Sequence, residues 1–233
     1  LYGENAQGKT NILESIFLCS MGKSFRTNKD KEMIKISERT CSVEVEYEKS
    51  DREGKIKIEI GNKKNIFING IKIKKLSELL GKINVVIFTP DDIEIIKGGP
   101  EKRRKFLDIM ISQLRPNYMY ILSLYQKTLE QRNNYLKQIK EEKKDENLLE
   151  IWDNKLCEYA IKIYEYREEF INKLIPKIEK IHNEITNNKE KIKIEYMTEC
   201  KNKETYLNLL KQRRKLDIIK GFTTKGIHRD DFM

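Results

Sequence analysis

Histidine, cysteine and tryptophan are scarce in this chain of 233 residues, which holds two, four and one of them. No cysteine lies at metal-ligand spacing from another cysteine or from a histidine. We therefore expect reduced thiols and no metal site built from these residues, as is usual in a cytoplasm. No Ser-His-Asp, Cys-His or paired-carboxylate arrangement stands out either. Hydrolytic chemistry on anything but a nucleotide thus has no support in the sequence.

Long apolar runs are also missing. No stretch approaches the ~20 apolar residues of a membrane span, and no signal peptide is visible. We expect a cytoplasmic protein without a membrane partner. The chain opens with Leu1 rather than Met, so we also expect residues to precede it.

Positive charge is abundant, with a formal net charge of +10. It is concentrated in three segments. Residues 17–39 carry six basic side chains against three acidic ones, residues 97–115 carry six against two, and residues 203–229 carry eight against two. Clustered basic segments suit a polyanion such as nucleic acid. An ordinary solvated surface is the alternative, and charge alone does not decide between them.

The first third of the chain shows strand patterns. Apolar residues alternate over 41–47 and 56–60, which predicts half-buried strands. Asn69-Gly70 stands between two short apolar runs and predicts a tight hairpin, because both residues tolerate positive φ. The run Val85-Val86-Ile87-Phe88 predicts a fully apolar strand.

From Glu101 onward the spacing is helical. Two apolar seams, over 122–139 and 149–170, are joined by the polar stretch 141–146 and predict an antiparallel helical hairpin. An ordinary two-helix layer over a sheet is the alternative. The tyrosines in this region, at helical spacing, are expected to pack in the core rather than stack on bases. A strand over 192–196, a basic helix over about 204–216, and a loop leading to another strand complete the chain.

The strongest motif lies at the start of the chain and matches G-x-x-x-x-G-K-[ST] in full. Apolar residues precede it and a helical pattern follows, as the motif requires. Its glycines let backbone N–H groups wrap a phosphate chain, and the following helix directs its free N–H groups and positive end at the anion. The lysine adds positive charge for the β- and γ-phosphates, and the threonine hydroxyl faces Mg²⁺. The residues are Gly3, Glu4, Asn5, Ala6, Gln7, Gly8, Lys9 and Thr10. We predict that they bind ATP, with Lys9 catalytic and Thr10 a metal ligand.

Further motifs follow in a fixed order. They are GENAQGKTNILESI from Gly3, GKSFR from Gly22, VIFTPDD from Val86, RRKFLD from Arg103 and HRDD from His228. Together they resemble the RecF family of bacterial DNA replication and repair proteins, over the full length of the chain. That family is similar to the heads of SMC-type ATPases of the ABC class.

The resemblance implies an α/β fold, in which a P-loop ABC-type ATPase lobe with antiparallel strands carries an inserted helical lobe. We expect ATPase lobe over 1–100, helical lobe over 101–190, and a return to the ATPase lobe over 191–233. It also implies an ATP-dependent homodimer that clamps duplex, gapped or single-stranded DNA, partnership with RecR and RecO, and help in loading RecA.

ABC-class hydrolysis also needs a signature segment and a Walker B strand with acidic ends, which the family places after HRDD. We find neither within the chain and expect both beyond Met233. The chain is therefore expected to be an internal piece of a weak, DNA-stimulated ATPase, inactive by itself. Asp230 and Asp231 do not follow an apolar strand and are not a Walker B pair. No glutamine stands beside Thr89-Pro90 to sense water and Mg²⁺.

Several basic residues are candidate DNA contacts, each with a structural alternative. Arg26 follows the P-loop helix. Arg103 and Arg104 lie within the second basic segment, where ion pairing is the somewhat favoured alternative. The third segment contributes a dense cluster, Lys211, Arg213, Arg214 and Lys215. By the resemblance, His228 and Arg229 approach nucleotide in the dimer. Two other functions remain open, a small-molecule phosphotransferase and a non-catalytic DNA-binding scaffold.

Overall fold

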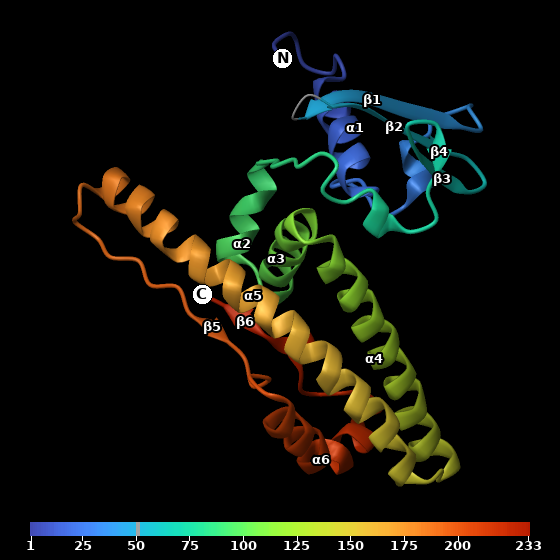
Figure 1. Ribbon diagram of the computed structural model, residues 1–233, viewed down its shortest axis with the longest axis vertical. Helices are drawn as coiled ribbons and strands as arrows, with labels where there is room; N and C mark the ends of the chain where they lie inside the picture. Colours follow the sequence, from blue (N-terminus) through green and yellow to red (C-terminus); the bar gives the residue numbers. More distant parts are fainter. Residues whose placement is uncertain (50–51) are drawn as a thin grey trace. The chain divides into compact units, whose positions relative to one another are not determined.

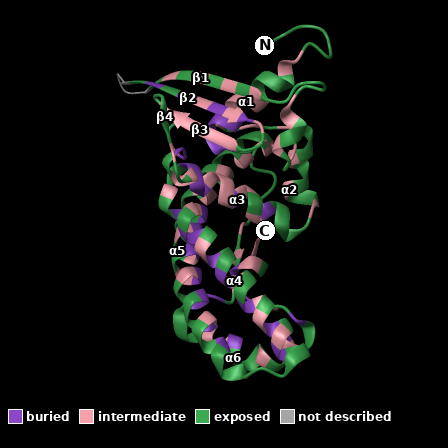
Figure 2. Ribbon diagram, turned by 90° about the vertical axis from the view of Figure 1, so that its right-hand side faces the viewer, coloured by how far each residue is buried: buried purple, intermediate pink, exposed green. Residues whose placement is uncertain are grey.

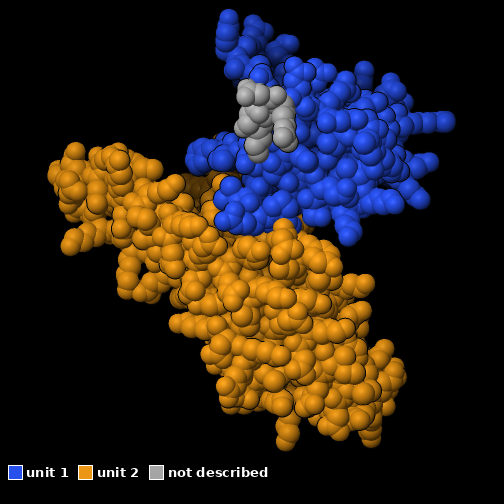
Figure 3. Space-filling model, viewed as in Figure 1, with its two compact units in different colours: residues 1–89, 112–116 blue, residues 90–111, 117–233 orange. Residues whose placement is uncertain are grey.

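A computed structural model describes residues 1–49 and 52–233 (Figure 1). The described chain forms two compact units (Figure 3). Unit 1 comprises residues 1–89 and 112–116, and unit 2 comprises residues 90–111 and 117–233. Residues 191–233 group with the helices of unit 2 in this arrangement. The division into 1–100, 101–190 and 191–233 stays a prediction.

Unit 1 combines the α-helix α1 (Lys9–Met21) with an antiparallel sheet in the order β1-β2-β3-β4. The strands are β1 (Cys41–Lys49), β2 (Arg52–Ile60), β3 (Lys64–Ile68) and β4 (Ile71–Lys72). The strands predicted from alternation are therefore confirmed. The hairpin is confirmed as well, because Asn69 and Gly70 join β3 to β4 with φ of 51° and 81°.

The core of unit 1 lies between α1 and one face of the sheet. Ile56, Ile58 and Ile60 point to this face of β2 and are buried, together with Leu18 of α1 and Leu79. Full burial of each such side chain contributes about 1.5–3 kcal/mol. The other face carries alternating lysines and glutamates that pair between β1 and β2 and along β2. This packing fixes α1, and with it the loop at its N-terminal end.

The strand predicted at Val85–Phe88 is not formed. Residues 84–89 belong to no helix or sheet among the described residues. The backbone of Val85 instead pairs with the side-chain amide of Gln113, at 2.7 Å from N to Oε1 and 3.1 Å from Nε2 to O. Val86 and Phe88 are largely exposed. The prediction was wrong because an apolar run alone does not supply a neighbouring strand.

Unit 2 is helical. Its elements are α2 (Glu94–Lys97), α3 (Pro100–Leu114, which enters unit 1 at residue 112), α4 (Pro116–Glu142), α5 (Leu149–Thr186) and α6 (Lys203–Lys220). α4 and α5 form the predicted hairpin, and Figure 2 shows buried residues along them. Near the turn, Leu136, Ile139 and Leu149 form a buried cluster. The ring centroids of Tyr135 and Trp152 lie 4.8 Å apart beside it.

Short strands and a capped helix complete unit 2. The strand predicted over 192–196 pairs only at its end, where β5 (Tyr196–Met197) meets β6 (Asp231–Phe232). The basic helix is confirmed as α6, whose first turn is capped by the Asn202 side chain. Among the described residues, β5 and β6 form the sheet of unit 2, and each has only two residues. The alternative of a two-helix layer over a sheet therefore does not describe unit 2. None of the described helices is both long enough and apolar enough to span a membrane.

Candidate nucleotide-binding site

The loop before α1 has the backbone of a phosphate-binding nest. Gly3, Ala6 and Gly8 have φ of 150°, 65° and 83°. Alternation between left-handed and right-handed conformations turns successive N–H groups inward, which creates a concavity for anions. Gly8 is the last residue before α1 and lies in the left-handed region, where a side chain would be strained. The sequence thus places glycine where this path requires it.

Lys9 closes the loop from inside. Its Nζ donates to the carbonyl oxygens of Gly3 and Glu4 at 2.8 and 2.5 Å. The ammonium group is therefore already held over the concavity. Exchange of these carbonyls for phosphate oxygens replaces neutral acceptors with charged ones, which bind more strongly.

The residues present fit a triphosphate. No side chain caps the first turn of α1, and no acidic residue lies in that turn. Its N–H groups and positive dipole end thus remain available to an anion. Thr10 follows with its side chain exposed, where its hydroxyl can reach a metal ion bound to the phosphates. The described residues include no group of three or more His, Cys, Asp or Glu side chains able to hold a metal alone.

Arg26 is tied to the same helix. Its Nη1 lies 3.0 Å from Glu14 Oε2 and 3.1 Å from Asn11 Oδ1. The Ser24 hydroxyl donates to Glu14 and accepts from the Arg26 N–H group. The guanidinium is half exposed and is held one turn beyond Thr10. A role for Arg26 toward DNA or nucleotide stays a prediction.

Arg103 and Arg104 lie in unit 2 and face the C-terminal stretch. Arg103 forms a bidentate pair with Asp231, at 2.7 and 2.8 Å, which holds the pKa of Asp231 below its usual range. Arg104 donates to the Asp230 carbonyl oxygen at 2.6 Å. These contacts occupy both guanidinium groups with structural partners. DNA contact by either arginine stays a prediction that nothing in the geometry favours.

The basic cluster of α6 divides into two kinds of side chain. Arg214 is mostly buried against Asp153 at 3.0 Å, and Lys211 lies 3.7 Å from Glu150. Arg213 and Lys215 are exposed. Of these predicted DNA contacts, the exposed pair has the accessible charge that phosphate binding needs.

Comparison with known proteins identifies the family. No family model matches the chain. The chain is 46% identical over 238 residues to the DNA replication and repair protein RecF of Clostridium acetobutylicum, which covers 100% of this chain and 65% of that protein. RecF of Acetivibrio thermocellus is 41% identical over 245 residues, covering 100% and 66%. The chain belongs to the RecF family.

Solved structures of RecF agree with this assignment. Two are described as the recombination mediator protein RecF in the RecFOR pathway, one as RecF-ATPrS and one as RecF-ATP. They match with TM-scores of 0.93 at 42% and 43% identity, and each match covers 99% of this chain and 65% of that one. The expected α/β fold of an ABC-type ATPase head with a helical lobe is therefore confirmed. The chain spans about 65% of the length of these RecF proteins.

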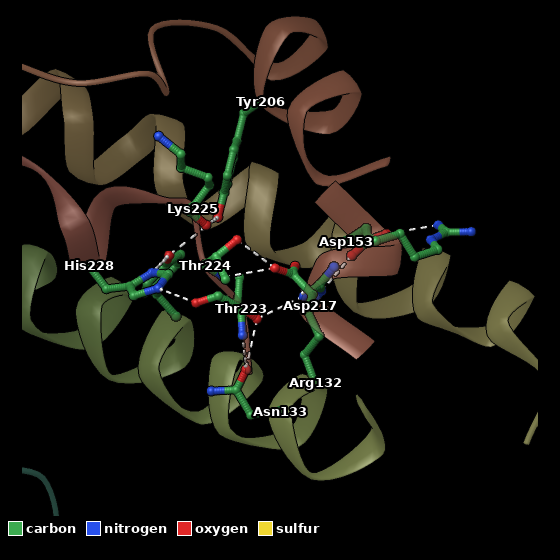
Figure 4. Close-up of polar contacts among 11 residues, drawn as sticks. Arg132, Asn133, Asp153, Tyr206, Asp217, Thr223, Thr224, Lys225 and His228 are labelled. Atoms are coloured by element: carbon green, nitrogen blue, oxygen red, sulfur yellow. Dashed lines mark hydrogen bonds and ion pairs between the residues drawn. The ribbon is translucent and has the colours of Figure 1, made fainter. Parts of the chain in front are cut away.

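One feature of this RecF-family chain was not predicted. Arg132 of α4 is fully buried and binds Asp153 of α5 at 2.7 Å and Asp217 of α6 at 2.8 Å (Figure 4). Its Nη1 also donates to Thr223 Oγ1 at 2.8 Å. The only sequence signal was a charged residue in a gap of the α4 seam. Its partners, 21 and 85 positions away, give no local pattern.

His228 extends this polar region. Its Nδ1 accepts from the Tyr125 hydroxyl at 2.7 Å, and its Nε2 donates to the Thr223 carbonyl oxygen at 3.2 Å. Burial lowers the pKa of His228 to about 4, so the ring is neutral at physiological pH. In the described chain it is a packing residue of unit 2. Its predicted approach to nucleotide in a dimer stays a prediction.

Proposed function

We propose that residues 3–10 form the ATP site of a DNA-repair ATPase of the RecF family. The observation that carries the proposal is the left-handed Gly8 leading into an uncapped α1, with Lys9 Nζ held over the loop. Relatives described with ATP and ATPrS bear the same fold over this whole chain. A phosphotransferase is less well supported, because the sheet after α1 is an antiparallel meander rather than a series of βαβ units.

Each residue of the loop has a distinct part in this site. The amide groups from Asn5 to Thr10 and the end of α1 bind phosphate oxygens. Lys9 neutralises charge between the β- and γ-phosphates, and Thr10 contributes one oxygen ligand to Mg²⁺. Bound Mg²⁺ would supply charge neutralisation on the phosphates. Catalysis by such a site consists of positioning and electrostatic stabilisation, without a covalent step on the protein.

For the whole protein we propose an ATP-dependent homodimer in the bacterial cytoplasm. ATP closes the dimer on DNA at gapped or stalled replication sites, and slow, DNA-stimulated hydrolysis releases it. The dimer acts with RecR and RecO and so helps to load RecA. The resemblance and the clustered positive charge, +10 over the chain, support this role. Arg26, Arg213 and Lys215 have exposed charge and are the candidates for DNA contact.

The decisive test is Lys9→Ala in the full-length protein, with MgATP binding measured by calorimetry. Loss of hydrogen bonds to a charged group is expected to weaken binding about 10- to 100-fold. ATP-dependent dimerisation and retention on DNA should be lost with it. Lys63→Ala is the matched control, because Lys63 is an exposed lysine of unit 1 in the turn between β2 and β3.

Equal MgATP affinity for Lys9→Ala and Lys63→Ala would overturn the proposed site. Weakened nucleotide binding with unchanged DNA retention by Lys9→Ala would overturn the switch instead. ATP turnover measured with and without duplex DNA separates this function from a phosphotransferase, whose turnover does not respond to DNA.

A further inference from the structure

A cavity of about 670 Å³ lies in unit 2, and no residue of the P-loop motif lines it. Its walls are the end of α6, the loop from Gly221 to Asp230, and the stretch from Tyr196 to Lys201. The volume is typical of pockets that hold a small molecule or one nucleotide. Nothing in the proposed ATP site uses it.

The loop on one wall of this cavity is held rigidly from behind (Figure 4). Thr223 bonds to Asn133 through both its N–H and its hydroxyl group, at 2.8 Å each. Thr224 bonds to Asp217 in the same way, at 2.9 and 2.7 Å, and Arg132 holds Asp217. At Gly226 an added Cβ would lie 2.3 Å from the Tyr206 hydroxyl oxygen. These contacts restrain the backbone of the loop, which presents its outward side chains to the cavity.

Positive charge in the cavity exceeds the negative charge that could neutralise it. Glu199 is paired with Lys225 at 2.7 Å, and Asp230 accepts from the Tyr196 hydroxyl at 2.6 Å with Arg167 3.9 Å away. Three further lining residues, Lys201, Lys220 and Arg229, have no carboxylate partner among the described residues. Near the end of α6, the carbonyl oxygens of Asp217 and Ile218 accept from the N–H groups of Gly221 and Phe222.

An aromatic ring lies among these cations. Phe222 is 39% exposed on the cavity wall, and the Arg229 guanidinium carbon lies 5.7 Å from its ring centroid. Exposed aromatic rings beside arginine and lysine are the usual platform for single-stranded nucleic acids, because every base has a π face and every nucleotide has a phosphate. A duplex keeps its bases stacked inside and cannot use such a ring.

The geometry points to a binding site for one or two nucleotides of a single-stranded DNA, with a base on Phe222 and phosphates on Lys201, Lys220 and Arg229. The choice of DNA among phosphate-bearing ligands rests on the proposed repair function. The site itself lies in unit 2 and does not involve the P-loop. It is therefore tested without nucleotide, and its failure would leave the ATP site standing.

The first experiment measures salt dependence in the full-length protein, with fluorescence anisotropy of labelled (dT)₁₂. Single strands lose about 0.7 units of log K per unit of log salt for each phosphate contacted. The triple variant Lys201→Gln, Lys220→Gln, Arg229→Gln should therefore bind with a slope shallower by about two units. The control variant Lys127→Gln, Lys140→Gln, Lys155→Gln removes the same charge from exposed sites on α4 and α5 and should keep the parental slope. Equal slopes for both variants would overturn the proposal.

The second experiment tests stacking. Phe222→Ala should weaken (dT)₁₂ binding about tenfold and leave binding of a 12-base-pair duplex unchanged. Phe222→Trp keeps a π face and should retain binding of the single strand. Parental (dT)₁₂ affinity in Phe222→Ala, equal weakening for strand and duplex, or failure of Phe222→Trp to retain binding would each overturn the site. Thermal melting of both variants checks that the fold is intact.

Discussion

Replacement of the buried Arg132 should destabilise unit 2 more than any exposed ion pair of the chain can. The guanidinium joins three helices, because Asp153 belongs to α5, Asp217 to α6 and Arg132 itself to α4. All three side chains have no solvent exposure. In Arg132→Met, Asp153 keeps Arg214 at 3.0 Å, whereas Asp217 loses its cation and stays buried.

The structure sets the magnitude of this effect. Removal of one partner from a buried pair costs about 3–5 kcal/mol, because the remaining charge is left without compensation. Lys162 and Glu158 form an exposed i,i+4 pair on α5 at 3.0 Å, and such a pair contributes about 0.3–0.5 kcal/mol. Lys162→Met is thus a control on the same helix, with an expected effect about tenfold smaller.

Native-state hydrogen exchange of the α4 and α5 amides in the full-length protein measures this difference for unit 2 alone. Arg132→Met should lower their opening free energy by about 3–5 kcal/mol, with little change for Lys162→Met. Arg132→Lys should be intermediate, since one ammonium group cannot satisfy both carboxylates in the same geometry. A loss below about 1 kcal/mol for Arg132→Met would refute the reasoning.

Two further predictions concern the loop after α6. Gly226→Ala should destabilise unit 2 by about 1–3 kcal/mol, because its φ is 143° and the added Cβ would meet the Tyr206 and Tyr125 hydroxyls; a melting temperature equal to the parent would contradict this. The second prediction concerns pH. Burial lowers the pKa of His228 from 6.5 to about 4, so between these pH values the unfolded chain binds a proton at His228 and the folded chain does not. The free energy of unfolding should therefore fall by up to about 3 kcal/mol as pH drops from 6.5 to 4. Its neighbours Arg104 and Arg229 act in the same direction and Asp217 opposes them. Chemical unfolding at several pH values should show a flatter dependence in His228→Gln, and an unchanged profile would exclude His228 as the cause.

Local sequence patterns predicted the parts of the fold that local physics determines. The P-loop helix, the Asn69-Gly70 hairpin and the helical hairpin each depend on spacing or turn chemistry within a short stretch. The Val85–Phe88 strand failed, because a strand needs a partner and the described chain offers only the amide of Gln113. Hydrogen bonding between strands requires a second segment of chain, and a run of four apolar residues does not determine whether one is available.

The charged residues show the same boundary. From the sequence alone, Arg103, Arg104 and Arg214 were candidate DNA contacts of the same kind as Arg213 and Lys215. The structure separates them, because the first three have partners 128, 126 and 61 positions away. Arg132 was not listed at all, although it organises three helices. Which arginine is buried depends on tertiary contacts that no spacing encodes.

The polar turn between α4 and α5 has a consequence for how the length of this helical hairpin can vary. The turn is exposed, and the seam behind it repeats in heptads. Seven residues added to each helix would lengthen the hairpin by about 10 Å and leave every existing contact along the seam in register. An unmatched insertion in one helix would instead shift the facing side chains. The length of the hairpin can thus change in steps of seven residues per helix, while the packing between α4 and α5 stays the same.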